Sequence, residues 1–195
     1  MMMCASIESR HGQRGVALFI SLVMLLILTL LGVSAVQTTA LQERMSRNSF
    51  DNNLAFQATE SAVRDAEDFI EDNFNSLVMF DTAGAEDNGF YYDNEWNETP
   101  NWENIDWDTD QECDPSSVPT GVRAAETEVP GVCVQPKYII EHVKTVVSDQ
   151  DRLNLDNIGQ GTGTGRTQVF RITALGTGGT KTAHVLLQTT YGKKF

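Results

Sequence analysis

An uncharged apolar segment near the N-terminus constrains this chain more than any other part of its sequence. Residues 16–36 contain no charged side chain, and a basic group formed by Arg10, His11 and Arg14 precedes them. As a helix this segment would be about 32 Å long, enough to cross a hydrocarbon layer of about 30 Å. No Lys or Arg follows until Arg44, so the positive-inside rule predicts a cytoplasmic N-terminus and export of the remainder.

The residues of this segment allow three interpretations. The first is a permanent single-pass anchor, and the second is a secretory signal removed after the small residues Val33, Ser34 and Ala35. The third depends on Gly15, which separates the basic group from the apolar run. A short basic leader that ends in Gly directly before an apolar segment resembles the class III leader of type IV prepilins, with residues 1–15 as the leader.

Acidic residues are concentrated in the middle of the chain. The net charge is −13, and residues 81–128 hold 14 acidic side chains against one basic side chain, Arg123. Such a surface repels nucleic acid and anionic lipid, so neither is expected to bind the exported part. A solvated acidic face is one interpretation of this charge, and attraction of divalent cations or of a basic partner is the other.

The three cysteines divide between two compartments. Cys4 lies in the leader on the cytoplasmic side, where thiols stay reduced, whereas Cys113 and Cys133 lie in the exported part, where disulfides persist. Two exported cysteines allow one intramolecular pairing, so we predict a disulfide worth about 3 kcal/mol in the loop-entropy model. Their spacing, without a matching pair of histidines, argues against a zinc site.

Small apolar residues continue a helical period beyond the apolar segment. Spacings of three and four relate Ala55, Ala58, Ala62, Ala66, Phe69 and Ile70. We therefore predict one long helix from residue 16 to about residue 75, apolar in its first part and amphipathic within residues 37–79. The alternative is a break between two helices in the polar residues 46–53, which are weak helix formers.

The segment that follows, residues 80–137, shows little periodicity and is rich in Asp, Asn, Gly and Pro. It also holds Trp96, Trp102 and Trp107, which supply apolar area to bury. Together with the predicted disulfide, these tryptophans favour an ordered, irregular insertion over a disordered one.

Alternating aspartates in this insertion are candidate calcium ligands. Asp106, Asp108 and Asp110 are spaced like the start of a calcium-binding loop. Gln111 and Ser117, however, stand where an EF-hand has its Gly and its final Glu. The sequence therefore does not predict an EF-hand, and only an irregular calcium site remains as a hypothesis.

The C-terminal segment, residues 138–195, is predicted to form an antiparallel sheet. Its expected strands are residues 138–147, 167–174 and 184–191. Glycine-rich residues 159–165 connect the first pair of strands, and residues 176–180 connect the second pair as a hairpin. The expected fold is α+β, with the alanine stripe of the long helix covering one face of an antiparallel β-meander.

Enzyme chemistry is not indicated by the residues. The exported part holds two histidines, His142 and His184, both in strand-like contexts. No nucleophile elbow, phosphate-binding loop or zinc signature accompanies them. We expect a protein without catalytic activity and without a cofactor.

Four stretches of this chain resemble the PilX-type minor pilins of type IV pili. They are QRGVALFISLVMLLILTLLGVSAVQTTALQERMSRN, LAFQATESAVRDAE, FRITALGTGG and VLLQTTY. The resemblance implies a type IV pilin fold in which a long N-terminal helix packs on a C-terminal sheet. It also implies that prepilin peptidase cuts after Gly15 and that Val16 becomes an N-methylated N-terminus.

Ile20 departs from the pattern of most pilins, which carry a glutamate at this fifth position after the cleaved bond. In a filament that glutamate faces the N-terminal amine of a neighbouring subunit, which offsets the cost of a lone carboxylate in a membrane. Ile20 cannot form this pair. In this respect the chain resembles the PilX-type pilins and the K-type pseudopilins of type II secretion, which are placed at the filament tip.

The resemblance implies a minor pilin that primes type IV pilus assembly and sits at or near the tip. Its expected partners are other minor pilins, the major pilin, prepilin peptidase and the inner membrane. The head would be periplasmic before assembly and at the cell surface afterwards, in a system that serves adhesion and twitching motility. A K-type pseudopilin, and a tip adhesin or surface-sensing module, are the alternatives.

Overall fold

The computed structural model describes residues 15–93, 100–107, 113–114, 118–146 and 166–194. The chain divides into two compact units, Met1–Arg47 and Asn48–Phe195. The second unit, here called the head, contains the sheet and its hydrophobic core.

The first element is a single helix, α1, which spans Val16–Asn73. It passes through the polar residues 46–53 without a break, so the prediction of one long helix is confirmed. No Gly or Pro occurs between Gly32 and Gly84, and the helix ends close to the expected residue 75. The ion pair between Arg47 and Glu43, at 2.5 Å across one helical turn, adds local support.

Five strands form one sheet, and the order of the four longer ones is β1-β3-β4-β5. Their bounds are Phe90–Tyr92 (β1), Arg123–Ala124 (β2), Lys137–Val146 (β3), Thr167–Thr177 (β4) and His184–Lys194 (β5). Strands β3, β4 and β5 pair antiparallel in chain order, which confirms the predicted meander. Strand β1, however, pairs with β3 in parallel, so the sheet as a whole is mixed.

The segment between α1 and β3 contributes more regular structure than its sequence indicates. It adds β1 and β2 to the sheet and also contains helix α2 (Val78–Asp81), the 3-10 turn η1 (Glu86–Asn88) and helix α3 (Asn101–Asn104). These elements are too short to produce a recognisable hydrophobic periodicity in the sequence. Trp96 and the predicted connection 159–165 lie outside the described residues.

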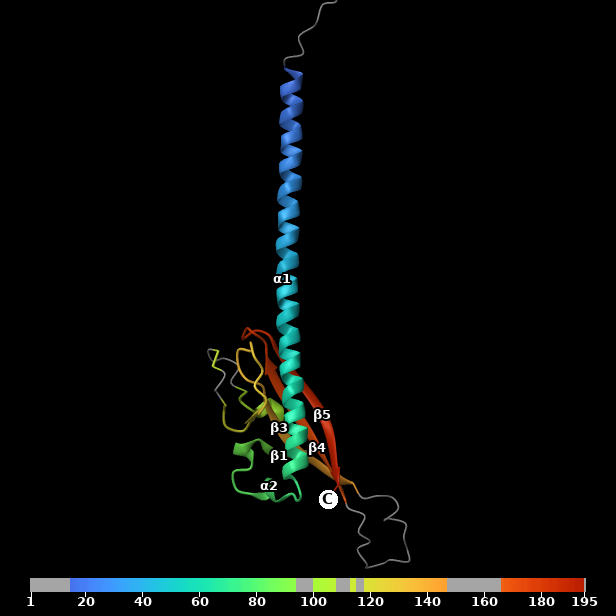
Figure 1. Ribbon diagram of the computed structural model, residues 1–195, viewed down its shortest axis with the longest axis vertical. Coiled ribbons are helices and arrows are strands. Elements are labelled where there is room, and N and C mark those ends of the chain that lie inside the picture. Colours follow the sequence, from blue (N-terminus) through green and yellow to red (C-terminus); the bar gives the residue numbers. More distant parts are fainter. Residues whose placement is uncertain (1–14, 94–99, 108–112, 115–117, 147–165, 195) are drawn as a thin grey trace, which may run out of the picture. The chain divides into compact units, whose positions relative to one another are not determined.

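The head buries the predicted alanine stripe of α1 against the sheet, and Figure 1 shows the C-terminal part of α1 lying over the strands. Five residues of this stripe are fully buried: Ala55, Ala58, Ala62, Ala66 and Ile70. Phe69, the sixth predicted member, is partly buried beside the core. The stripe meets Tyr138, Ile140 and Ile172 from the middle strands, so the expected cover of the apolar sheet face is confirmed.

An aromatic cluster closes the end of this core. The ring centroid of Phe74 lies 5.2 Å from Phe80, 5.6 Å from Phe90 and 5.3 Å from Phe170. Phe74 directly follows α1, Phe80 belongs to α2 and Phe90 to β1, whereas Phe170 comes from the distant strand β4. The aromatic contacts therefore fix the short segments after α1 onto the sheet.

Candidate functional sites

The predicted cleavage position lies at the beginning of α1. Both Gly15 and Val16 are exposed, and the carbonyl of Gly15 accepts the first helical hydrogen bond, from the N–H of Phe19 at 3.2 Å. A Cβ atom placed on Gly15 would meet no described atom within 4 Å. A larger residue at position 15 would therefore meet no described part of the fold.

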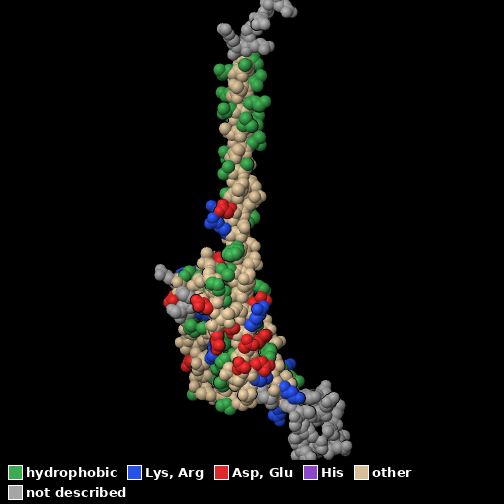
Figure 2. Space-filling model, in the orientation of Figure 1, with side chains coloured by type: hydrophobic (Ala, Val, Ile, Leu, Met, Phe, Trp, Pro, Cys, Tyr) green, Lys and Arg blue, Asp and Glu red, His purple; other side chains and the backbone are tan. Residues whose placement is uncertain are grey.

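The apolar part of α1 has the length and composition of a membrane span, and the structure contains one such helix among its described residues. Its large side chains are exposed, and Figure 2 shows hydrophobic side chains along the visible face of this segment. Ser21 and Thr29 donate hydrogen bonds of 2.8 Å to the carbonyls of Leu18 and Leu26 in the preceding helical turn. These hydroxyls therefore need no partner from a hydrocarbon environment.

Ile20 lies on this exposed apolar surface and is 53% exposed. The described neighbours along the helix are also uncharged from Val16 to the end of the apolar segment. The segment therefore offers no carboxylate that could pair with the amine of a neighbouring N-terminus.

The predicted disulfide between Cys113 and Cys133 is present, with the two Cα atoms 4.7 Å apart. The N–H of Cys133 donates to the carbonyl of Gly178 at 2.6 Å, and Val134 donates to Thr177 at 3.0 Å. The disulfide thus ties the insertion to a segment that is itself bonded to the end of β4 and the connection that follows it.

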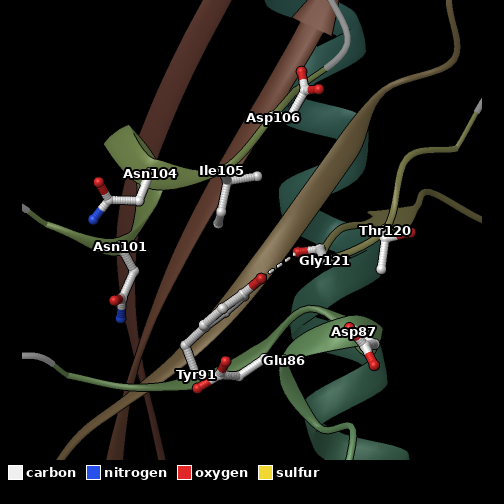
Figure 3. A pocket seen from close by; sticks show the side chains of 9 residues that line it. All are labelled: Glu86, Asp87, Tyr91, Asn101, Asn104, Ile105, Asp106, Thr120 and Gly121. Carbon is white, nitrogen blue, oxygen red and sulfur yellow. Dashed lines mark hydrogen bonds between the residues drawn. The ribbon is translucent and has the colours of Figure 1, made fainter.

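A polar pocket of about 440 Å³ opens between β1, η1, α3 and the turn before β2. Nine residues line it, and Figure 3 shows them: Glu86, Asp87, Tyr91, Asn101, Asn104, Ile105, Asp106, Thr120 and Gly121. Three of these side chains are carboxylates and none of these nine is Lys or Arg. The chain segments described here therefore form an electronegative hollow.

Tyr91 and Gly121 define one wall of this pocket. The hydroxyl of Tyr91 donates to the carbonyl of Gly121 at 2.8 Å, and a Cβ on Gly121 would lie 2.7 Å from that hydroxyl. Gly121 also has a φ of 89°, a conformation that side chains rarely adopt. Burial, followed by the charges of Glu86 and Asp87, raises the pKa of Tyr91 to about 12, so its hydroxyl stays a donor at neutral pH.

A buried polar network lies beside the pocket. Glu141 of β3 accepts a hydrogen bond from Asn101 at 2.8 Å and lies 3.8 Å from the guanidinium of Arg171 on β4. Arg171 also pairs with Asp93 at 2.9 Å, next to β1. Asn101 further donates to the carbonyl of Tyr92 at 2.8 Å. The network therefore joins α3 and the end of β1 to the central strands.

The calcium hypothesis rests on residues that the structure describes only in part. Asp106 lines the pocket, whereas Asp108 and Asp110 lie outside the described residues. Within the described part of the chain, no three His, Cys, Asp or Glu side chains are grouped so that they could hold a metal ion.

His142 and His184 occupy different environments. His142 Nε2 lies 2.9 Å from Gln168 Oε1, and its ring lies 5.7 Å from the rings of Tyr92 and Phe170. His184 is exposed at the start of β5. His142 thus packs at the aromatic cluster and His184 lies on the surface.

The pocket and its network were not predicted from the sequence. One signal was available, because Glu141 places a charge directly after the apolar residues 138–140 of β3, which indicates a buried polar partner. A second was the turn sequence Pro119, Thr120 and Gly121. Neither signal identifies Tyr91 or Asn101 as the contacting residue.

Two family models match the chain. The model described as PilX N-terminal matches residues 14–64, and the model described as type IV pilus assembly protein PilX C-term matches residues 75–193. No curated protein and no solved structure is significantly similar to the chain. The first match covers the apolar segment and α1 as far as residue 64, and the second covers strands β1 to β4 and all but the last residue of β5. The chain therefore belongs to the PilX family of type IV pilus assembly proteins.

Proposed function

We propose that this protein is a minor pilin that primes type IV pilus assembly and occupies the filament tip. Its family supports a role in pilus assembly. The tip position is supported by the presence of Ile20 at the fifth position after the cleavage site, because the segment from Val16 to Val36 then offers no carboxylate to the amine of another subunit. A subunit that has no neighbour beyond it needs no such carboxylate.

The same proposal includes processing and location. Prepilin peptidase cleaves the bond between Gly15 and Val16, and the new terminus is N-methylated. The apolar part of α1 holds the protein in the inner membrane with the head in the periplasm until the filament carries it to the surface. The exposed, uncharged and internally hydrogen-bonded surface of this segment supports packing in lipid and, later, against other pilin helices.

The expected partners are other minor pilins and the major pilin. Pilin helices would pack along the apolar part of α1, where the described side chains are exposed. The head has its own core and its own disulfide, so its surface is free to contact other heads.

Replacing Ile20 with Glu tests the tip position. The new carboxylate can pair with the amine of a neighbouring subunit, so we expect the variant to appear along the filament shaft. Immunogold counting on isolated pili would measure this, with Ile20→Leu as the matched apolar control. Tip-only labelling of both variants, or shaft labelling of the unmodified protein, contradicts the proposal.

A deletion strain separates the pilus from a secretion pseudopilus. Loss of the protein should reduce the number of surface pili while type II secretion continues at its normal rate. Normal pili with impaired secretion would instead identify a K-type pseudopilin. Restoring the full-length chain should return pilus number to normal.

A tip adhesin or surface-sensing module is the second candidate, favoured by the pocket in the insertion. Deleting residues 81–128 would not test it cleanly, because β1 and the buried Phe90 would be lost. The double variant Glu86→Gln with Asp87→Asn keeps these elements and removes two pocket charges. Normal pili with lost surface attachment would support adhesion, and Asp72→Asn, exposed at the end of α1, is the control.

A further inference from the structure

Strand β5 forms one edge of the sheet over its whole length. It pairs with β4 from Thr177↔His184 to Thr167↔Lys194, and no described residue pairs with its outer side. The opposite side of the sheet is different, because the outer side of β3 is occupied by the short strands β1 and β2. Among the strands that the structure describes, β5 alone therefore presents a long unpaired edge.

The backbone groups that face outward on this edge follow from the pairing. The N–H of Gly178 donates to the carbonyl of Ala183, which marks these opposite residues as a hydrogen-bonded pair. In an antiparallel ladder such pairs alternate, so Val185 and Leu187 direct their N–H and C=O groups toward β4. The backbone N–H and C=O groups of the alternate residues point away from the sheet; these residues are Leu186, Gln188 and Thr190.

This edge lacks the features that usually protect an exposed strand. Residues 184–191 contain no Pro, Gly, Lys, Arg, Asp or Glu, and β5 pairs with β4 without a bulge. Lys193 does not guard the edge, because its Nζ donates to the carbonyl of Ile70 at 2.9 Å and pairs with Glu71. A long, uncharged and regular edge is a template for another strand.

One flank of α1 lies beside this edge. Thr59 Oγ1 is 3.1 Å from the carbonyl of Val185, and Tyr191 donates to the carboxylate of Glu71. The residues on that flank recur at helical spacing: Phe56, Glu60, Val63, Glu67 and Glu71. Figure 2 shows acidic side chains gathered on the visible face of the head.

The flank carries Phe56 at one end and the carboxylates of Glu67 and Glu71 at the other, and the carboxylate of Glu60 between them lies 3.7 Å from the guanidinium of Arg64. Phe56 is 43% exposed and lies about one helical turn before Thr59, which contacts the Val185 carbonyl. At the Tyr191 end, the hydrogen bond to Glu71, then burial and the charges of Glu71, Glu67 and Asp68, raise the pKa of Tyr191 to about 12. An added strand would place alternate side chains against this flank. Apolar residues fit its first end, and Lys or Arg fits its second end.

We propose that the open edge of β5 binds an extended segment of another protein, which adds to the sheet as a strand. The side chains of that segment that face α1 are apolar near Phe56 and basic near Glu67 and Glu71. A partner of this charge complements the flank, whereas a second copy of this chain would bring together two molecules of net charge −13. The inference rests on the head alone and holds whether or not the protein occupies a filament tip.

A synthetic peptide with this pattern tests the proposal on the full-length chain in detergent micelles. The peptide Lys-Thr-Lys-Thr-Val-Thr-Val, added antiparallel, places its lysines by Tyr191 and its valines by Val185. We expect it to slow hydrogen exchange at the amides of Leu186, Gln188 and Thr190 by at least about tenfold. The same peptide with N-methylated threonines cannot donate to β5 and should have no effect.

Substitutions in β5 provide matched controls. Gln188→Pro removes an outward N–H without breaking the β4 ladder, a position where an edge strand tolerates Pro. It should abolish the slowing at Leu186 and Thr190, whereas Gln188→Ala should preserve it. Glu67→Lys should weaken binding of the lysine peptide and favour a peptide with Glu in place of Lys.

Three results overturn the proposal. The first is unchanged exchange with the lysine peptide at saturating concentration in a folded chain. The second is equal slowing by the N-methylated peptide, which would mean that backbone pairing is not involved. The third is slow exchange of the edge amides before any peptide is added, which would mean that the edge is already covered. Dependence on protein concentration would then identify a second copy as the cover, and independence would identify another part of this chain.

Discussion

At the scale of single residues, the interior of the head contains one carboxyl group that merits a test, that of Glu141. The side chain of Glu141 is only 1% exposed, and Oε2 has no hydrogen-bond partner among the described atoms. Burial raises the pKa of Glu141, while the hydrogen bond from Asn101 and the charge of Arg171 act in the opposite direction with smaller effect. The neutral form of Glu141 is therefore favoured by folding.

Glu141→Gln should flatten the pH dependence of stability. Because the folded-state pKa is raised, the stabilisation from Glu141 is fully present below the unfolded pKa and is lost as pH rises through the folded pKa. Gln keeps an acceptor for Asn101 and has no charge to desolvate, so the variant should match or exceed the unmodified protein at neutral pH.

Urea denaturation at a series of values from about pH 4 to pH 8 would measure this effect. Glu103→Gln, at an exposed position in α3, is the control and should leave the slope unchanged. A Glu141→Gln variant with the same pH slope as the unmodified protein would show that the carboxyl is not desolvated.

Gly176 fixes the distance between α1 and β4. A Cβ there would lie 2.5 Å from Thr59 Oγ1 and 2.6 Å from the carbonyl of Ala55. We expect Gly176→Ala to lower the free energy of unfolding by about 1–3 kcal/mol, as in other overpacked cores. Gly192→Ala, where the nearest atom is 3.5 Å away, is the control for denaturation. Equal stability of both variants would contradict the close packing.

At the scale of secondary-structure elements, α1 holds two loops of the head through aspartates. Asp51 accepts hydrogen bonds from the N–H groups of Gly179 and Thr180, at 2.6 Å and 3.2 Å, in the connection before β5. Asp65 accepts from the N–H and the hydroxyl of Thr127, at 2.7 Å and 2.8 Å. The helix thus orders chain segments that have no regular structure of their own.

Asp65→Ala should loosen the end of the insertion near Thr127. Loss of two partly exposed, charge-assisted hydrogen bonds should cost about 1 kcal/mol of unfolding free energy. Hydrogen exchange at Thr127 should also become faster, while exchange in β4 changes little. Asp72→Ala is the control on the same helix, and an unchanged Thr127 amide would contradict the role of Asp65.

The predictable elements are those whose pattern is local. The alanine stripe of α1, the apolar start of β3 after Lys137 and the alternation in the first half of β4 are local patterns of burial, so these elements were found from the sequence. Strand β1 depends instead on its pairing with β3 and on the rings around Phe90. The pocket depends on the contact between Tyr91 and Gly121, 30 residues apart, which no local period encodes.

At the scale of the whole molecule, two parts of the chain need different surroundings. Residues 16–36 expose large apolar side chains, which lipid or other helices must cover. The head instead buries its own core and is closed by a disulfide of the kind that persists outside the cytoplasm. Both features fit a pilin with a single-pass membrane anchor and a separately folded head.

Removing the disulfide should destabilise the head without releasing the protein from membranes. The double variant Cys113→Ser with Cys133→Ser should lose about 3 kcal/mol of unfolding free energy in the loop-entropy model. Thermal denaturation of the detergent-solubilised chain would measure this, and Ser49→Ala, at an exposed position in α1, would serve as the control. Identical melting with and without the disulfide would show that packing alone holds the insertion.

The most direct test of the pilin account is the intact mass and N-terminal sequence of the membrane-bound protein. We predict a chain that begins at a methylated Val16 in cells that contain prepilin peptidase, and the full-length precursor in cells that lack it. An N-terminus at Val36 would identify an exported protein released by a signal peptidase. An intact leader in both strains would identify an ordinary membrane anchor, and either result would contradict the proposed role in the filament.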